Sequence, residues 1–241
     1  MKPAFELLSF ASADDLAGAA AGAWLDEIET AARLGELYCV ALSGGRITQK
    51  FFAATVAQAL VRKVPFDDVH FFWADERCVP PGDPESNFKL AQEHLFAPLE
   101  IAAEKIHRLH GEDPPRIAVA LAEAELRRIV PRKHGRQPVL DLIFLGMGED
   151  GHVASLFPNA SMHTIDTPGP FLVVEHAPKP PPTRISLSYQ AIGAAKDIWV
   201  LISGSGKAAA LRESLLPTGQ TPLARVVATH RVKIFSDIND F

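Results

Sequence analysis

One stretch constrains the fold more than any other: residues 139–158, which read VLDLIFLGMGEDGHVASLFP. Its first seven residues form an apolar run interrupted only by Asp141, which predicts a strand buried on both faces at the centre of a parallel sheet. Gly146, Gly148 and Gly151 then end the strand, because glycine tolerates positive φ and lets other groups approach the backbone closely. The stretch therefore predicts an α/β protein with a glycine-rich turn after its central strand.

Asp150 and His152 stand inside this turn. Open α/β sheets carry their chemistry at the carboxyl ends of central strands, so this carboxylate and imidazole are candidate catalytic groups. A surface loop whose His and Asp only face water is the alternative, and the three glycines argue against it. The letters also satisfy G-x-G-x-x-G, with Glu175 at the later position that a dinucleotide site requires. Two facts argue against a dinucleotide site. The negative charge of Asp150 would lie beside the negative pyrophosphate, and Pro158 leaves room for only about two turns of the helix that must follow the glycines.

The rest of the chain alternates between strand and helix patterns. This alternation predicts one domain over residues 1–241, with a doubly wound, mostly parallel sheet and helices on both faces. A polar segment at 74–87 with three prolines is too long for a plain connector and is expected to be a functional loop. The expected strands are 4–10, 37–42, 69–73, 139–145, 171–175, 184–188, 197–203 and 232–235, and the expected helices are 12–34, 46–60, 87–96, 114–130, 189–195 and 205–216.

Composition bounds the possible partners. Twenty-four basic and 29 acidic side chains give a net charge of -5, so nothing favours a nucleic-acid or anionic-membrane surface, and an anionic ligand would need a local basic cluster. Only Cys39 and Cys78 occur, which suggests reduced thiols in a cytoplasmic protein. Neither a secretory signal nor a membrane-spanning apolar stretch is visible.

Four turns follow predicted buried strands and are expected to meet at one edge of the sheet. They are Ser43-Gly44-Gly45, 75–77, 146–152 and 204–207. Together they supply backbone N–H groups at helix starts, cations, carboxylates and one imidazole, an inventory that fits an anionic small molecule.

Two of these turns partly match other known motifs. The GSGK at 204–207 lacks the first glycine and the magnesium-binding hydroxyl of a phosphate-binding loop, so we reject that motif. The ALSGG at 41–45 has the form of a nucleophile elbow, which makes a serine esterase with Ser43 as nucleophile a competitor. The one histidine in a strong turn is only two residues from an aspartate, an awkward spacing for a triad. The remaining histidines show no metal-binding spacing, so no metal is expected.

Five segments carry a resemblance to a known family. Together, and in this order along the chain, they resemble the glucosamine-6-phosphate isomerase/6-phosphogluconolactonase family. The segments are SGG at 43–45, FFWADERCVPPGDPESN at 71–87, GMGEDGHVASLFP at 146–158, PPTRISLS at 181–188 and GSGKAAAL at 204–211.

The resemblance implies hydrolysis of 6-phospho-D-glucono-1,5-lactone to 6-phosphogluconate, a step of the oxidative pentose phosphate pathway, without a metal or organic cofactor. It implies that His152 is the general base and that Asp150 orients or polarises the imidazole. Asp75 is assigned to a sugar hydroxyl or the attacking water, and Arg77 to the phosphate or the developing oxyanion.

The resemblance places the substrate phosphate against Arg184, Lys207 and the turn that contains Ser43, Gly44 and Gly45. Here the chain departs from the family's pattern, because Arg46, Ile47 and Thr48 follow the glycines where the family usually has Ser, Thr and Pro. Two readings of Arg46 stay open: it supplies a charge to the phosphate, or it points to solvent.

Two rival functions share this fold. A deaminase or isomerase acting on an amino-sugar phosphate would need an acid at the position held by Phe157, and a phenyl ring cannot transfer a proton. A sugar-phosphate sensor would carry a DNA-binding segment, and no basic helix-turn-helix pattern precedes Ala41. The oligomeric state stays open, and a monomer is compatible with the sequence.

Overall fold

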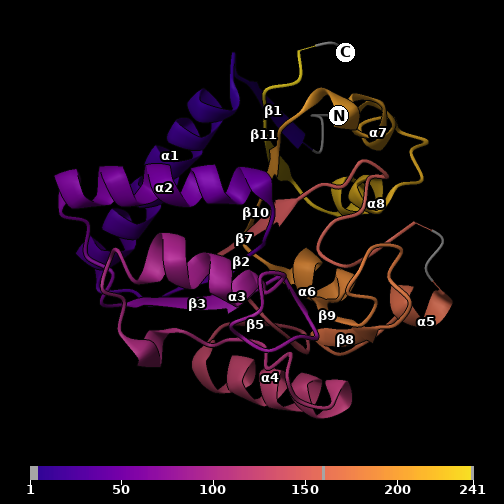
Figure 1. The fold of residues 1–241 in the computed structure, drawn as a ribbon, viewed down its shortest axis with the longest axis horizontal. Coiled ribbons are helices and arrows are strands. Elements are labelled where there is room, and N and C mark those ends of the chain that lie inside the picture. The colour runs from indigo at the N-terminus through magenta and orange to yellow at the C-terminus, as the bar shows by residue number, and fades with distance from the viewer. Residues whose placement is uncertain (1–4, 159–160, 240–241) are drawn as a thin grey trace.

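The computed structural model describes residues 5–158 and 161–239. Its centre is a six-stranded sheet in the order β1-β11-β10-β7-β2-β3, in which every neighbouring pair is parallel (Figure 1). The predicted, mostly parallel sheet is confirmed. Its strands are β1 (Phe5–Ser9), β2 (Tyr38–Leu42), β3 (Val69–Trp73), β7 (Leu142–Gly146), β10 (Asp197–Ile202) and β11 (Val232–Ser236).

Helices cover both faces of this sheet, as expected for a doubly wound fold. Figure 1 shows α1 (Ala13–Leu34) and α2 (Arg46–Arg62) on one side, and α6 (Tyr189–Ala194), α7 (Ala208–Ser214) and α8 (Pro222–Thr229) on the other. Sequence reasoning missed α8, although Thr221 caps its first turn and Pro222 opens it, which is an ordinary helix start signal. The remaining helical elements are α3 (Asn87–Ala91), η1 (Gln92–Phe96), η2 (Ala103–Lys105), α4 (Pro115–Ile129), α5 (Met162–Ile165) and η3 (Ser205–Lys207).

Helix α1 illustrates how local sequence sets an element. The Ser12 side chain accepts a hydrogen bond from the backbone N–H of Asp15, which satisfies a free donor of the first turn. Gly35 ends the helix with φ 65°, the left-handed conformation that favours glycine. Between these ends the helix buries Trp24, which packs against Phe51 of α2 and Phe144 of β7 with ring centroids 5.4 and 5.1 Å apart. This contact attaches both helices to the centre of the sheet.

Residues 74–87 are not wholly a loop, and that expectation was wrong. Asp75–Arg77 form β4, the edge of a second, antiparallel sheet in the order β4-β9-β8, where β9 is Arg184–Leu187 and β8 is Phe171–Val174. In its register Asp75 pairs with Ser186, and Arg77 pairs with Arg184. A three-residue strand carries no periodic pattern, and its partner is more than a hundred residues away, so sequence could not reveal the pairing. A hairpin of β5 (Lys133–His134) and β6 (Gln137–Pro138) lies before β7.

The sheet reverses its strand order between β2 and β7. From β2 the chain passes through α2 to β3 on one side, and from β7 it reaches β10 on the other. The ladder between β2 and β7 consists of only two pairs, Val40 with Leu142 and Ala41 with Ile143. Crevices at such switch points are where open α/β sheets bind ligands. The fold therefore predicts a site between the turn after β2 and the turn after β7.

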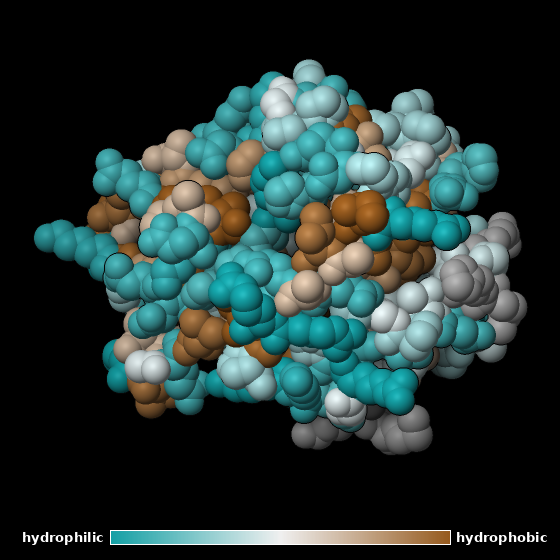
Figure 2. Space-filling view, turned by 90° about the horizontal axis from the view of Figure 1, so that it is seen from below, coloured by the Kyte–Doolittle hydropathy of each residue, from teal (hydrophilic) through white to brown (hydrophobic). Residues whose placement is uncertain are grey.

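The inner face of α2 is buried at Ile47, Phe51, Thr55 and Ala59, whereas Leu60 is 60% exposed. Leu60 lies one residue beyond Ala59, about 100° further round the helix, so it falls off the buried stripe. On the molecular face drawn in Figure 2, hydrophobic residues form several separate groups among polar ones, which is ordinary for a protein surface. None of the described helices is long and apolar enough to cross a membrane.

A chain of side chains ties α4 and the segment before it to the edge strand β3. His70 of β3 shares a hydrogen bond with His107 (Nδ1 to Nε2, 2.7 Å), and His107 in turn contacts Glu125 of α4 (Nδ1 to Oε1, 2.7 Å). With Glu125 ionised and both imidazoles neutral, His107 donates from Nδ1 to Glu125 and accepts at Nε2, and His70 donates to it from Nδ1. Lys105 Nζ lies 3.5 Å from the remaining His70 nitrogen. The nearby ammonium disfavours a charged His70.

We expect these histidines to make the protein less stable in mild acid. Burial first, and then the charge of His107, lower the pKa of His70 to about 4, and burial lowers the pKa of His107. Unfolded histidines take up protons near pH 6.5, before the folded ones do, so stability is complete above that pH and falls as pH drops toward 4. Allowing for solvent screening, the free energy of unfolding should fall by about 1–2 kcal/mol between pH 7.5 and pH 5. Urea unfolding at both pH values measures this; His70→Gln should flatten the dependence, whereas the exposed His134→Gln should keep it.

Candidate active site

A cavity of about 360 Å³ opens at the switch point between β2 and β7. It brings together residues from both sheets and from the starts of α2 and η3. Nine of the ten site residues predicted from the sequence line it, and the tenth, Asp150, lies behind it in contact with His152. The nine are Ser43, Gly44, Gly45, Arg46, Asp75, Arg77, His152, Arg184 and Lys207.

His152 and Asp150 form a hydrogen-bonded pair in the turn after β7. The imidazole Nδ1 lies 2.5 Å from Asp150 Oδ1, which also accepts the backbone N–H of His152 at 3.2 Å. Burial acts to raise the pKa of Asp150, but the hydrogen bond and charge of His152 hold it below the ordinary value. An ionised Asp150 keeps the proton of His152 on Nδ1. The other ring nitrogen, Nε2, makes no hydrogen bond to the described residues and is left as a proton acceptor in the cavity wall.

The glycines of this turn give the imidazole its place. A Cβ atom on Gly148 would lie 2.1 Å from His152 Nδ1, so the ring packs directly on the glycine backbone. Gly151 has φ 79°, and a Cβ there would lie 2.6 Å from Thr221. No helix follows within residues 147–158, so the dinucleotide interpretation fails: the glycines accommodate an imidazole and the N-cap of α8.

Asp75 faces the same cavity from the edge of the antiparallel sheet. It is 5% exposed, and its Oδ2 accepts the Ser155 hydroxyl at 2.6 Å. The side chain of Asn87 donates to the backbone carbonyl of Asp75 at 2.9 Å, and its Oδ1 would lie only 1.9 Å from a Cβ on Gly44. The Asn87 side chain therefore packs between the turn after β2 and Asp75. Sequence reasoning missed Ser155 and Asn87, because only their long-range contacts distinguish them from ordinary polar residues.

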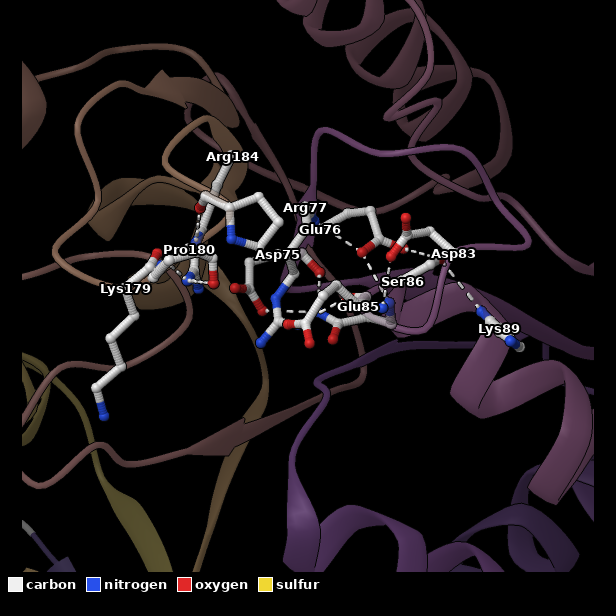
Figure 3. A network of polar contacts seen from close by, with 12 residues as sticks. Asp75, Glu76, Arg77, Asp83, Glu85, Ser86, Lys89, Lys179, Pro180 and Arg184 are labelled. Carbon is white, nitrogen blue, oxygen red and sulfur yellow. Dashed lines mark hydrogen bonds and ion pairs between the residues drawn. The ribbon is translucent and has the colours of Figure 1, made fainter.

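Glu76 fastens the proline-containing loop to β4 (Figure 3). Its buried carboxylate accepts the backbone N–H groups of Arg77, Asn87 and Phe88 and the hydroxyl of Ser86. Burial raises the pKa of Glu76, and the three backbone N–H groups oppose that rise. Two of these donors belong to the first turn of α3, so Glu76 caps that helix from a distance and fixes the position of Asn87.

The cavity holds cations that lack carboxylate partners. Among the described residues, Arg46, Arg184 and Lys207 form no ion pair, whereas Arg77 Nη1 contacts the backbone oxygen of Glu85 at 2.7 Å and its carboxylate at 3.4 Å. Burial is the main cause that lowers the pKa of Arg184 and of Lys207, followed by the positive charges of Arg77 and Arg46 respectively. The cavity therefore favours an anionic ligand, whose charge offsets the cost of burying these cations.

Two details complete the arrangement of the cations. Arg184 is the first residue of β9, so it lies at a strand end, but in the antiparallel sheet, and its guanidinium donates to the carbonyls of Lys179 and Pro181 at 2.9 and 3.1 Å (Figure 3). Arg46 is exposed and also lines the cavity. It can therefore be in contact with solvent and still contribute its charge to the cavity. The cations converge because two sheets face the same crevice.

Ser43 and the glycines after it form the start of α2. The Ser43 hydroxyl donates to the carbonyl of Phe144 at 2.8 Å, and the side chain is buried. No hydrogen bond joins Ser43 to His152 among the described residues, so the geometry does not support the serine-esterase interpretation. Gly45, with φ 117°, precedes a first turn that no side chain caps. The N–H groups of this turn are available to an anion.

A doubly wound α/β protein with an imidazole–carboxylate pair and unpaired cations at its switch point belongs to the class that acts on small anionic molecules. The comparison with known sequences specifies the family. The family described as glucosamine-6-phosphate isomerases/6-phosphogluconolactonase matches residues 11–235, and the chain belongs to that family. The resemblance inferred from the five motifs is confirmed.

Relatives in this family support the assignment. A 6-phosphogluconolactonase of Haemophilus influenzae is 37% identical over 174 residues, which are 72% of each chain. The enzyme of the same name from Treponema pallidum is 38% identical over 172 residues, covering 71% of this chain and 70% of that one. The crystal structure of a devB protein superposes with a TM-score of 0.84 at 30% identity, over 96% of this chain and 95% of that one. A monomeric glucosamine-6-phosphate deaminase, 18% identical with a TM-score of 0.80 over 96% of both chains, shares the fold alone.

Proposed function

We propose that this protein hydrolyses 6-phospho-D-glucono-1,5-lactone to 6-phosphogluconate, the lactonase step of the oxidative pentose phosphate pathway. The observation that carries the proposal is one cavity that combines the His152–Asp150 pair with unpaired cations. A neutral lactone carbonyl and a phosphate dianion together need both features. The two sequence relatives described above bear the name 6-phosphogluconolactonase.

His152 serves as the general base in this proposal. Its free Nε2 takes a proton from a water molecule as that water attacks the lactone carbonyl, and the resulting imidazolium is stabilised by ionised Asp150. The tetrahedral intermediate then breaks the bond to the ring oxygen, which receives the proton from His152. Asp75, held by Ser155 and Asn87, is directed at the water or a sugar hydroxyl.

The phosphate is assigned to the cations that lack partners. Arg184 and Lys207 provide charge, and the amides of Gly44 and Gly45 with the uncapped start of α2 provide further donors. Arg46 adds charge at the open side of the cavity. The ion pair of Arg77 with Glu85 orients its guanidinium, and we assign Arg77 to the phosphate or to the oxyanion that develops on the carbonyl.

The direct test generates the phosphorylated lactone in the assay and follows its hydrolysis above the spontaneous background. Catalysed hydrolysis by the purified protein supports the proposal, and a rate equal to the background rejects it. Assays for ammonia release from glucosamine 6-phosphate test the deaminase alternative. We expect none, because the phenyl ring of Phe157 cannot supply an acid for ring opening.

Replacing an unpaired cation should weaken substrate binding more than chemistry. Arg184→Ala and Lys207→Ala should each raise KM by about 10- to 100-fold, because a charge-assisted hydrogen bond contributes about 1.5–3 kcal/mol. The exposed Arg116→Ala and Lys133→Ala serve as matched controls with unchanged KM. Glucono-1,5-lactone without phosphate should be a poor substrate. The ratio of kcat/KM for the phosphorylated lactone to kcat/KM for the unphosphorylated one should be smaller in Lys207→Ala than in the parent protein. Equal kcat/KM for both lactones in the parent protein would remove the phosphate assignment.

The partner we propose is therefore a small sugar-phosphate lactone, and the chain's negative net charge gives no reason to invoke nucleic acid. We also propose a cytoplasmic location, because Cys39 and Cys78 are free thiols.

A further inference from the structure

Phe157 lies behind two groups that face the substrate cavity. Its ring centroid is 4.6 Å from that of the His152 imidazole, with the two planes inclined by 45°. The guanidinium carbon of Arg184 lies 5.6 Å from the centre of the same ring, within the range of a cation–π contact. Phe157 is 9% exposed and does not line the substrate cavity. One phenyl ring therefore touches both the base and a phosphate-binding cation without touching the site of the substrate.

The ring also separates two cavities. On its other side lies a cavity of about 560 Å³, which Phe157 lines together with Asp150. The pair of His152 and Asp150 spans this boundary, since the imidazole lines the first cavity and the carboxylate the second. Removing the ring would join the second cavity to the back of the imidazole, and water there would compete for the bond between Nδ1 and Asp150.

Each neighbour of the ring has few other side-chain contacts. Among the described residues, the His152 imidazole has one side-chain hydrogen bond, to Asp150, and packs on Gly148 next to that bond, so Phe157 is a further contact that limits its tilt. Arg184 is fixed by backbone carbonyls but has no ion pair among the described residues, so the aromatic ring is its one electron-rich side-chain contact. A catalytic group displaced by a fraction of an ångström loses much of its effect.

We propose that Phe157 is a positioning residue, which sets the orientation of the His152 imidazole and of the Arg184 guanidinium at the same time. The proposal rests on the lactonase function inferred above. It predicts a characteristic double effect, on turnover through His152 and on phosphate recognition through Arg184, from one apolar residue that the substrate does not touch.

Phe157→Leu tests the double effect. We expect kcat to fall about 10-fold from the tilted base. The KM for the phosphorylated lactone should rise about 3- to 10-fold through the lost cation–π contact. In an Arg184→Ala background the effect of Phe157→Leu on KM should vanish, while its effect on kcat should remain. Phe157→Tyr keeps the ring and should retain kinetics close to those of the parent.

A matched control separates positioning from general loss of packing. Phe10 is a partly buried residue stacked on Phe235, with ring centroids 6.1 Å apart, and it belongs to neither cavity. Phe10→Leu should lower stability without changing kcat or KM. If Phe10→Leu changes kcat and KM as much as Phe157→Leu does, the proposal is overturned. The proposal is also overturned if a folded Phe157→Leu protein keeps the kcat and KM of the parent.

Two further measurements do not depend on turnover. The Nδ1 proton shared with Asp150 should give a strongly downfield proton resonance in the parent, and this signal should broaden in Phe157→Leu as water gains access. The Kd for 6-phosphogluconate should rise in the same variant. Should Phe157→Leu fail to fold, Phe157→Met, with a flexible side chain, takes its place with the same expectations. If the parent protein shows no lactonase activity, the proposed function fails, whereas an unchanged resonance and Kd refute the role of Phe157.

Discussion

His152→Ala should lower kcat by about 10²- to 10⁴-fold while the protein stays folded, the range typical of a lost general base. The physical reason is that no described residue hydrogen-bonds Nε2, so this nitrogen can accept a proton, while Nδ1 is held by Asp150. KM should change little, because the phosphate is bound by other groups. Hydrolysis of the phosphorylated lactone, measured together with thermal unfolding, decides the outcome.

Two variants make this result specific. Asp150→Asn keeps the shape of the side chain but removes the charge that stabilises the imidazolium, so it should cause a smaller loss than His152→Ala. The exposed His134→Ala should have no effect on turnover. Near-parent activity in a folded His152→Ala protein would exclude His152 as the base.

Gly148→Ala should reduce turnover by about 10²-fold or more although it replaces none of the groups that react. The added Cβ would lie 2.1 Å from Nδ1 of His152 and 2.7 Å from Oδ1 of Asp150, so both side chains must move away from their present positions. Because the obstructing atoms belong to side chains and not to backbone, the fold should survive. Steady-state kinetics and the downfield proton of the His152–Asp150 pair measure the displacement.

Gly18→Ala is the matched control for this variant. Gly18 lies within α1, where an added Cβ meets nothing within 4 Å, and alanine should slightly favour the helix. Its activity should equal that of the parent. If Gly148→Ala retains full activity, the close packing of the imidazole on the glycine backbone is not required for the reaction.

The site combines two kinds of support around the reacting groups. His152 depends on a local turn, since Asp150 and Gly148 are its neighbours in sequence. Asp75, by contrast, depends on side chains that come from distant segments, Ser155 and Asn87, with Glu76 fixing the latter. Substitutions in the first group should therefore act on the His152–Asp150 pair, whereas substitutions in the second should disturb Asp75 and the turn at Gly44 together.

The sequence by itself determined most of the central sheet and the membership of the site. A strand buried on both faces, such as β7, is visible as an apolar run, and α1 is bounded by Ser12 and Gly35 through local hydrogen bonding and backbone conformation. The parallel order of such strands places their carboxyl ends at one edge. For that reason most of the predicted site residues could be assigned to one cavity before their distances were known.

Only the tertiary structure decided how the second sheet meets this edge. Arg77 and Arg184 are partners in an antiparallel ladder that joins segments more than a hundred residues apart, and neither segment carries a pattern that identifies the other. The contact of Asn87 with Gly44 and that of Phe157 with Arg184 likewise join residues far apart in the sequence. Periodicity and capping report on interactions within a few residues, whereas these positions are set by which surfaces pack together once the sheet has formed.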